Sequence, residues 1–250
     1  MKNIKFSFLI LLLLGAAACN KSNNSMPTLS VNGSVTTDDA ADMVAGSLSL
    51  NSDGVANMAS DATLNATVMG DAHLKCGTVR SDTISRQAGT GSPFSFSYKL
   101  TYNFMVDCNS NSQPDSLSSN LTYSGSYSGP NMSSSNSGSS NFGVGGLLPA
   151  DTAFVINGEY KRAGSFSSKI DTSKHGNDNI DITISKLTLK KPSRRIESGT
   201  ATFSITGSTP HKGSFSFTGT LVFNGDGTAT LTVNGNVYTI NLETGERHRH

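Results

Sequence analysis

The sequence lacks tryptophan altogether, has only three cysteines in 250 residues, and is poor in charged residues, which make up 15% of it. Lys and Arg together number 19 and Asp and Glu 18, so the formal net charge is +1 at pH 7. Nucleic-acid-binding domains usually carry a clear excess of basic residues. The charge balance therefore predicts no nucleic-acid partner.

Hydrophobic residues are also scarce, at 35% of the chain. The usual apolar share is about 45–50%, although that figure also counts glycine. Serine alone fills 39 positions and glycine 25. Such residues favour turns and the polar faces of strands over helix interiors. The composition therefore indicates an all-β protein whose core is thin or spread along a sheet.

The first 18 residues have the three parts of a signal peptide. Lys2 and Lys5 precede an apolar run from Phe6 to Leu14, and small residues follow up to Cys19. The apolar run is shorter than the ~20 residues that span a bilayer. We therefore expect residues 1–18 to be removed.

The position of Cys19 suggests a lipid anchor. Small residues directly before a cysteine at the end of a signal resemble the lipobox of bacterial lipoproteins, although Ala16 stands where leucine is usual. Acylation of the thiol, for example with palmitate, would hold the chain on a membrane without a spanning helix. The alternative is ordinary cleavage that leaves Cys19 unmodified. We expect an outer-membrane lipoprotein, with its periplasmic or surface orientation open.

Hydrophobic periodicity divides the rest of the chain. A helix is expected near residues 37–48, where acidic residues precede apolar positions at helical spacing. The predicted divisions are a flexible tether at 19–35, a short helical or loop region packing on the sheet at 36–70, an antiparallel β domain at 71–245 and a tail at 246–250.

The clearest strand signal is a stripe of seven alternate apolar residues from Phe94 to Val106. Such a strand would extend for about 40 Å, so it belongs to a large sheet. The same alternation recurs along the chain. We predict a large antiparallel curved sheet, a sandwich or half-barrel of about nine strands, with a short N-terminal helix.

Turn residues predict how these strands connect. Asn234-Gly235 is typical of a two-residue hairpin and Asn224–Gly227 of a four-residue turn. The apolar register shifts near Ser185-Lys186, which predicts a β-bulge. The stretch from Gly129 to Gly146 is rich in Ser, Gly and Asn and is expected to be a long mobile loop or a weak edge strand.

Cys76 and Cys108 form an even pair, which in an oxidising compartment indicates a disulfide. Two buried thiols are the alternative. A metal site is not expected, because neither cysteine belongs to a CxxC motif or lies near a pair of histidines.

The sequence contains no HExxH or GxSxG motif, and we expect neither catalysis nor a cofactor.

Asp107–Asp115 has part of the spacing of a calcium loop but lacks its glycine and final acid, so a polar loop is the simpler interpretation. Four basic residues between Lys190 and Arg195 predict a basic hairpin tip.

Together the signal ending in Cys19, the Asn/Ser-rich tether, the acidic, alanine-rich helical start, the Cys76 and Cys108 pair and the closing hairpin resemble uncharacterised lipoproteins of Bacteroidetes. The resemblance implies an envelope location and an all-β body, and no activity.

Two function classes remain open. The first is a structural, adhesive or glycan-contacting lipoprotein. The second is a carrier of an acyl chain or lipid in a barrel or half-barrel, with the ligand lined by Phe94, Phe96, Tyr98, Leu100, Tyr102 and Phe104. Whether this stripe is sealed by packing or faces a void discriminates between them. The oligomeric state is open.

Overall fold

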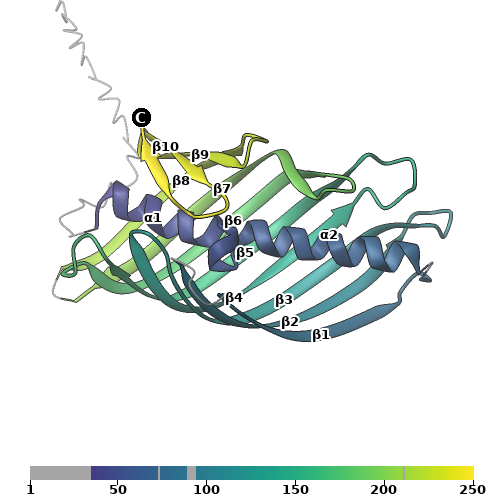
Figure 1. Ribbon diagram of the computed structural model, residues 1–250, viewed down its shortest axis with the longest axis horizontal. Helices are drawn as coiled ribbons and strands as arrows, with labels where there is room; N and C mark the ends of the chain where they lie inside the picture. The colour runs from purple at the N-terminus through teal and green to yellow at the C-terminus, as the bar shows by residue number, and fades with distance from the viewer. Residues whose placement is uncertain (1–34, 73, 89–93, 211) are drawn as a thin grey trace, which may run out of the picture. The chain divides into compact units, whose positions relative to one another are not determined.

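The fold is an antiparallel sheet that follows two helices, seen in a computed structural model that describes residues 35–72, 74–88, 94–210 and 212–250 (Figure 1). The helices are α1 (Thr37–Leu48) and α2 (Val55–Asp71), with a short 3-10 helix η1 (Leu50–Ser52) between them. The strands are β1 (Val79–Gln87), β2 (Ser95–Cys108), β3 (Pro114–Ser128), β4 (Met132–Gly145), β5 (Ala153–Ser168), β6 (His175–Lys190), β7 (Arg195–Thr209), β8 (Gly213–Phe223), β9 (Thr228–Val233), β10 (Asn236–Asn241) and β11 (Arg247–Arg249).

The described strands form a single sheet in which each pairs with its neighbours in sequence order, from β1 to β11. Every pairing is antiparallel, and β1 and β11 are the two edges. The sheet is curved and open (Figure 1). The expected all-β class and antiparallel sheet are confirmed, whereas the estimate of about nine strands is too low for a sheet of eleven.

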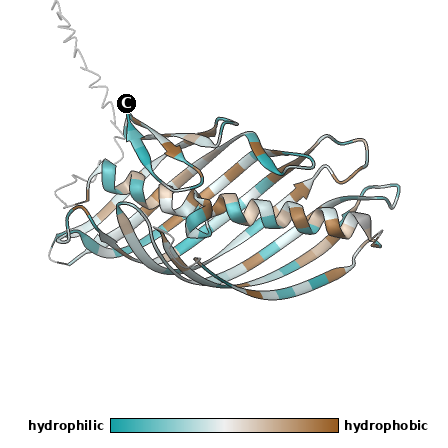
Figure 2. Ribbon diagram, in the orientation of Figure 1, coloured by the Kyte–Doolittle hydropathy of each residue, from teal (hydrophilic) through white to brown (hydrophobic). Residues whose placement is uncertain are grey.

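Alternation of apolar and polar residues explains the sheet. Along β2, Leu100 and Phe104 are buried while Lys99 and Thr101 are exposed, and the other long strands repeat this pattern. Figure 2 shows the alternation as bands along the strands. Since neighbouring side chains of a strand point to opposite faces, one face of the sheet is apolar and the other polar.

The prediction of a long mobile loop or a weak edge strand at Gly129–Gly146 is wrong, because most of this segment is β4, a strand in the interior of the sheet. Its inward positions include small polar residues such as Ser134 and Asn136, which hide the alternation. Rings from neighbouring strands fill the space instead. A Cβ placed on Gly138 would meet the Tyr123 ring, so glycine is required there for close packing.

The helical region contains two helices. Thr36 caps α1 in a capping box with Asp39, so the side chain of each accepts a hydrogen bond from the backbone of the other. α2 occupies a region whose sequence left helix and loop open. α1 contacts β4, β5 and β9 to β11, and α2 contacts β3 to β5. Both helices therefore cover the apolar face of the sheet (Figure 1).

The predicted turn chemistry is confirmed. Asn234 and Gly235 both have positive φ, 47° and 77°, as a type I′ hairpin requires. Asn224–Gly227 connects β8 and β9. The register of β6 against β7 shifts between Ser185 and Thr188, at the predicted bulge.

We predict opposite effects for alanine at two helical glycines. In Gly46→Ala the new Cβ would collide with the buried hydroxyl of Tyr127, and overpacking should lower the free energy of unfolding by about 1–3 kcal/mol. Gly70 has open space around it, so Gly70→Ala should raise stability by up to about 1 kcal/mol through helix propensity alone. Denaturant unfolding of the two variants checks this, and equal effects would contradict the packing of α1 on β3.

Candidate functional site

The aromatic stripe of β2 lies on the apolar inner face of the sheet. Tyr98, Leu100, Tyr102 and Phe104 are at most 5% exposed and belong to the hydrophobic core. Phe96 and Phe94, the remaining stripe residues proposed to line a ligand, are half-buried. Most of the stripe is therefore sealed by packing.

An arginine on β1 joins α2 to the sheet. The guanidinium of Arg86 lies 3.0 Å from a carboxylate oxygen of Asp53 and 2.7 Å from one of Asp61. The Tyr102 hydroxyl donates to the same Asp61 carboxylate. Burial raises the pKa of Asp53, because desolvation outweighs the attraction of Arg86. These contacts fix the beginning of α2 over the first two strands.

Charged groups also hold α1. Asp42 accepts hydrogen bonds from Arg247 Nε at 2.7 Å and from Asn131 Nδ2 at 2.9 Å. Asp39 lies 2.8 Å from Lys174 Nζ. Burial raises the pKa of Asp42 despite these partners. The acidic beginning of α1 is thus tied to the C-terminal strand and to two connections of the sheet.

A fully buried ion pair lies on the inner face of β5 and β6. Arg162 Nη2 lies 2.6 Å from Asp178 Oδ2, and both side chains are at most 1% exposed. Arg162 also donates to the Tyr127 hydroxyl at 3.5 Å. Although burial disfavours its charged form, the attraction of Asp178 raises the pKa of Arg162 well above its usual value. Each side chain of this buried pair therefore depends on the other for a partner.

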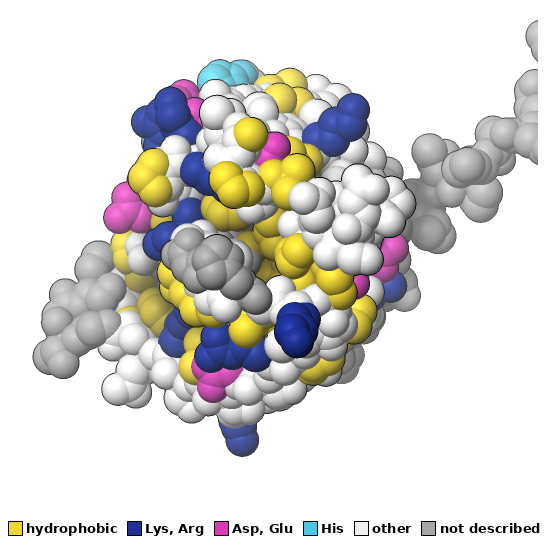
Figure 3. All heavy atoms as spheres, turned by 90° about the vertical axis from the view of Figure 1, so that its right-hand side faces the viewer, with side chains coloured by type: hydrophobic (Ala, Val, Ile, Leu, Met, Phe, Trp, Pro, Cys, Tyr) yellow, Lys and Arg dark blue, Asp and Glu magenta, His cyan; other side chains and the backbone are white. Residues whose placement is uncertain are grey.

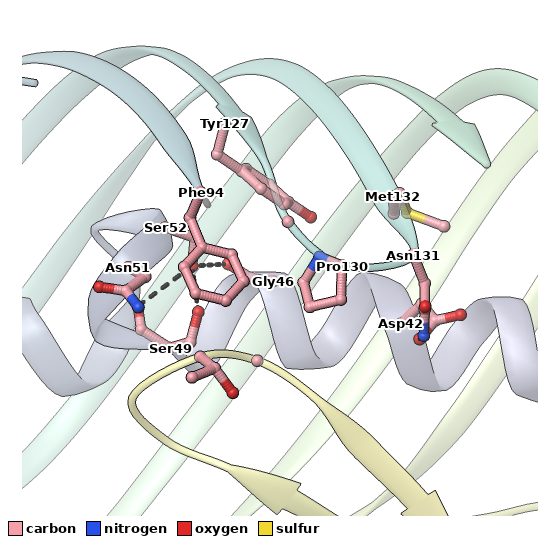
Figure 4. Close-up of a pocket in the computed structure, with 13 residues that line it drawn as sticks. Asp42, Gly46, Ser49, Asn51, Ser52, Phe94, Tyr127, Pro130, Asn131 and Met132 are labelled. Atoms are coloured by element: carbon pink, nitrogen blue, oxygen red, sulfur yellow. Dashed lines mark hydrogen bonds between the residues drawn. The ribbon is translucent and has the colours of Figure 1, made fainter. Parts of the chain in front are cut away.

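The described structure has a small crevice beside α1 and a wide groove at the ends of β5, β6 and β7. Figure 4 shows a crevice between α1 and the β3–β4 turn, lined by Asp42, Gly46, Phe94 and Tyr127 among others. Its volume of about 20 Å³ suits about one water molecule. The second is a wide groove of about 530 Å³ beside His175 that is open to solvent. Neither hollow encloses a chamber for an acyl chain.

The basic tip between β6 and β7 packs on the apolar end of the sheet. Lys191 Nζ lies 4.6 Å from the centre of the Phe154 ring, where the cation meets the ring face. Figure 3 views this end and shows Lys and Arg side chains beside hydrophobic ones. At least one of the four basic residues therefore covers apolar surface.

The outer face of the sheet presents polar side chains in rows that cross the strands. One row contains one residue from each strand from β2 to β9, paired in register. The row is Asn103, Asn120, Asn141, Glu159, Thr183, Thr202, Thr220 and Thr232. All are exposed except the half-buried Thr232. We call these eight residues the polar row.

The sulfur atoms of Cys76 and Cys108 lie at disulfide bonding distance, as the even pair predicted. The bond would join the connection between α2 and β1 to the end of β2. Cys19, the predicted lipidation site, lies outside the described residues.

The loop after β2 uses its oxygen atoms internally. Asn109 Oδ1 accepts from the backbone N–H groups of Asn111 and Gln113, and Asp107 accepts from the Ser118 hydroxyl. Within the described ranges, no group of three or more His, Cys, Asp or Glu side chains could hold a metal ion. None of the helices described there is long and apolar enough to cross a membrane.

The ion pairs on the inner face were not predicted from the sequence. A usable signal was present, because Arg162 follows Tyr160 and Asp178 precedes Ile180 at positions that share the inward side of their strands. A charged residue in such a position indicates a buried partner.

Comparisons with protein-family models, curated proteins and solved structures find no match.

We predict that Arg162 and Asp178 depend on each other. Asp178→Leu or Arg162→Met alone leaves one unpaired buried charge and should cost about 3–5 kcal/mol of unfolding free energy. The double variant removes both charges and should be more stable than either single variant. Denaturant unfolding of all three measures the coupling, and additive losses would show that the two charges do not compensate each other.

Proposed function

We propose that the chain is a lipid-anchored protein of the bacterial cell envelope with a non-catalytic role, and that it contacts glycans through the outer face of its sheet. The first part is supported by the sequence before Cys19, where a positive end, an apolar run and small residues follow in the order of a lipoprotein signal. Cys19 would carry the acyl chains that hold the protein on the outer membrane.

The polar row is the observation that carries the second part. Threonine hydroxyls and asparagine amides both donate and accept hydrogen bonds, as sugar hydroxyls do. Neighbouring strands lie about 4.8 Å apart, so the row offers such groups at regular intervals across eight strands. Only Glu159 in the row is charged. This surface suits an extended polymer that is rich in hydroxyl and amide groups.

The packed inner face supports glycan contact over carriage of a lipid, because most of the aromatic stripe of β2 is sealed by packing.

The aromatic side chains of the described strands are buried or half-buried, so stacking on sugar rings is not available on the outer face. Hydrogen bonds alone make weak individual contacts. Many copies anchored on one membrane and facing one polymer would add these contacts together.

We predict that Cys19→Ser abolishes lipid attachment. In cells that make the full chain, a radiolabelled fatty acid should label the native protein and not the variant, because serine lacks the thiol that is acylated. The native protein should sediment with membranes and the variant should not. Ser34→Ala, in the same segment, is the control. Equal labelling of native protein and variant would overturn the anchor.

We predict that removing three hydroxyls of the polar row weakens glycan binding. The variant Thr183→Val, Thr202→Val, Thr220→Val keeps the side-chain shape and the strand preference but loses three hydrogen-bonding groups. Its binding to isolated peptidoglycan, measured by co-sedimentation of the detergent-solubilised full chain, should fall at least tenfold.

Thr152→Val, an exposed change in the connection between β4 and β5, serves as the matched control and should bind as the native chain does. Undiminished binding by a folded triple variant would show that the polar row does not contact the glycan. Lack of binding by the native chain would rule out peptidoglycan as the polymer contacted.

A further inference from the structure

β1 is a long strand at the edge of the sheet. It pairs with β2 over all nine residues and with no other described strand. From Val79 to Thr83 every side chain is exposed, on both faces of the strand. An exposed edge of this length is a template for another strand.

The hydrogen bonds next to β1 show which backbone groups are free. Ala88 N–H donates to the Phe96 carbonyl, and Val106 N–H donates to the Thr78 carbonyl. In an antiparallel pair such bonds fall on alternate residues. The even-numbered residues of β1 therefore bond to β2, and Val79, Ser81 and Thr83 direct their N–H and C=O groups away from the sheet. No hydrogen bond within the described chain uses these outward groups.

Two charged side chains of the same segment also lack partners. Arg80 lies opposite Phe104 and Asp82 opposite Tyr102, on the side of the strand that faces the helices. Arg86 shares this side and pairs with two carboxylates of the helical region. Arg80 and Asp82 are exposed instead, and neither makes an ion pair or hydrogen bond with a described residue.

We propose that a second copy of this chain pairs with β1 in antiparallel orientation, about a two-fold axis at Ser81. In this register Arg80 lies opposite Asp82 of the second copy, and the reverse pair forms on the other side of the axis. Val79 lies opposite Thr83 of the second copy, so the outward backbone groups meet in hydrogen-bonded pairs. One pairing thus engages both the free backbone groups and the free charges.

Neighbouring registers are less favourable. A two-fold axis at Asp82 places this carboxylate against its own copy, and an axis at Thr83 places Arg80 against Arg86. Like charges directly opposite each other on paired strands are destabilising. An axis at Ile84 uses the half of β1 where Arg86 is already bound to Asp53 and Asp61. Charge complementarity therefore selects the axis at Ser81.

The pairing ends at two copies. A two-fold interface uses the same patch on both chains and closes on itself. The opposite edge, β11, has only three residues, and its Arg247 and Arg249 are bound to carboxylates of α1. The second edge is therefore short, and the proposed product is a dimer.

Cross-linking of Ser81→Cys in cells that make the full chain tests the contact. Residues in a hydrogen-bonded antiparallel pair have Cα atoms about 5.5 Å apart, which suits a disulfide. We expect a dimer on a non-reducing gel that disappears on reduction. Gln87→Cys lies on the same edge outside the paired segment and is the matched control. No dimer from Ser81→Cys, or equal dimer from Gln87→Cys, would overturn the proposed register.

A charge swap tests the pairing without a new cysteine. Arg80→Asp or Asp82→Arg places like charges opposite each other, and each should raise the dissociation constant of the dimer at least tenfold. The double variant exchanges the two charges, restores complementarity and should recover dimer formation. Sedimentation equilibrium of the detergent-solubilised full chain gives the masses. A monomeric native chain, or a double variant no better than the singles, would overturn the proposal.

Discussion

The ion pairs between the helices and the sheet determine how the inner face is closed. An open sheet has an apolar face that water would reach, and α1 and α2 cover it. Hydrophobic contact alone does not specify where a helix rests, because it has no direction. Arg86 and Arg247, each bound to helical carboxylates, give each helix a defined position. The packed core beneath depends on that placement.

Much of the fold follows from local features of the sequence, whereas the site does not. The alternation from Phe94 to Val106 and the Asn234-Gly235 turn depend on neighbours in the chain, so the antiparallel sheet could be predicted. β4 was missed because its small inward residues pack under rings from other strands, as Gly138 does under Tyr123. The partners of Arg86 were missed because Asp53 and Asp61 lie 33 and 25 residues away in the sequence, and only the packing of the helical region against β1 brings them together.

The two faces of the sheet have different chemistry, and the two proposals use different parts of it. The buried charges of Arg162 and Asp178 on the inner face are paired with each other, whereas the outer face presents mainly hydroxyl and amide groups. Glycan contact would use the broad outer face, and self-association would use only the edge at β1. A dimer would leave both outer faces free and bring two polar rows to the same polymer, which strengthens weak contacts.

A disulfide between Cys76 and Cys108, whose sulfur atoms lie at bonding distance, would close a covalent ring that contains β1 and β2. A single peptide-bond cut inside this ring leaves the chain in one piece. This edge of the sheet would therefore stay covalently attached to the rest of the chain after a nick. This tolerance of proteolysis would suit a protein that meets secreted proteases, and it would be lost wherever the bond is reduced.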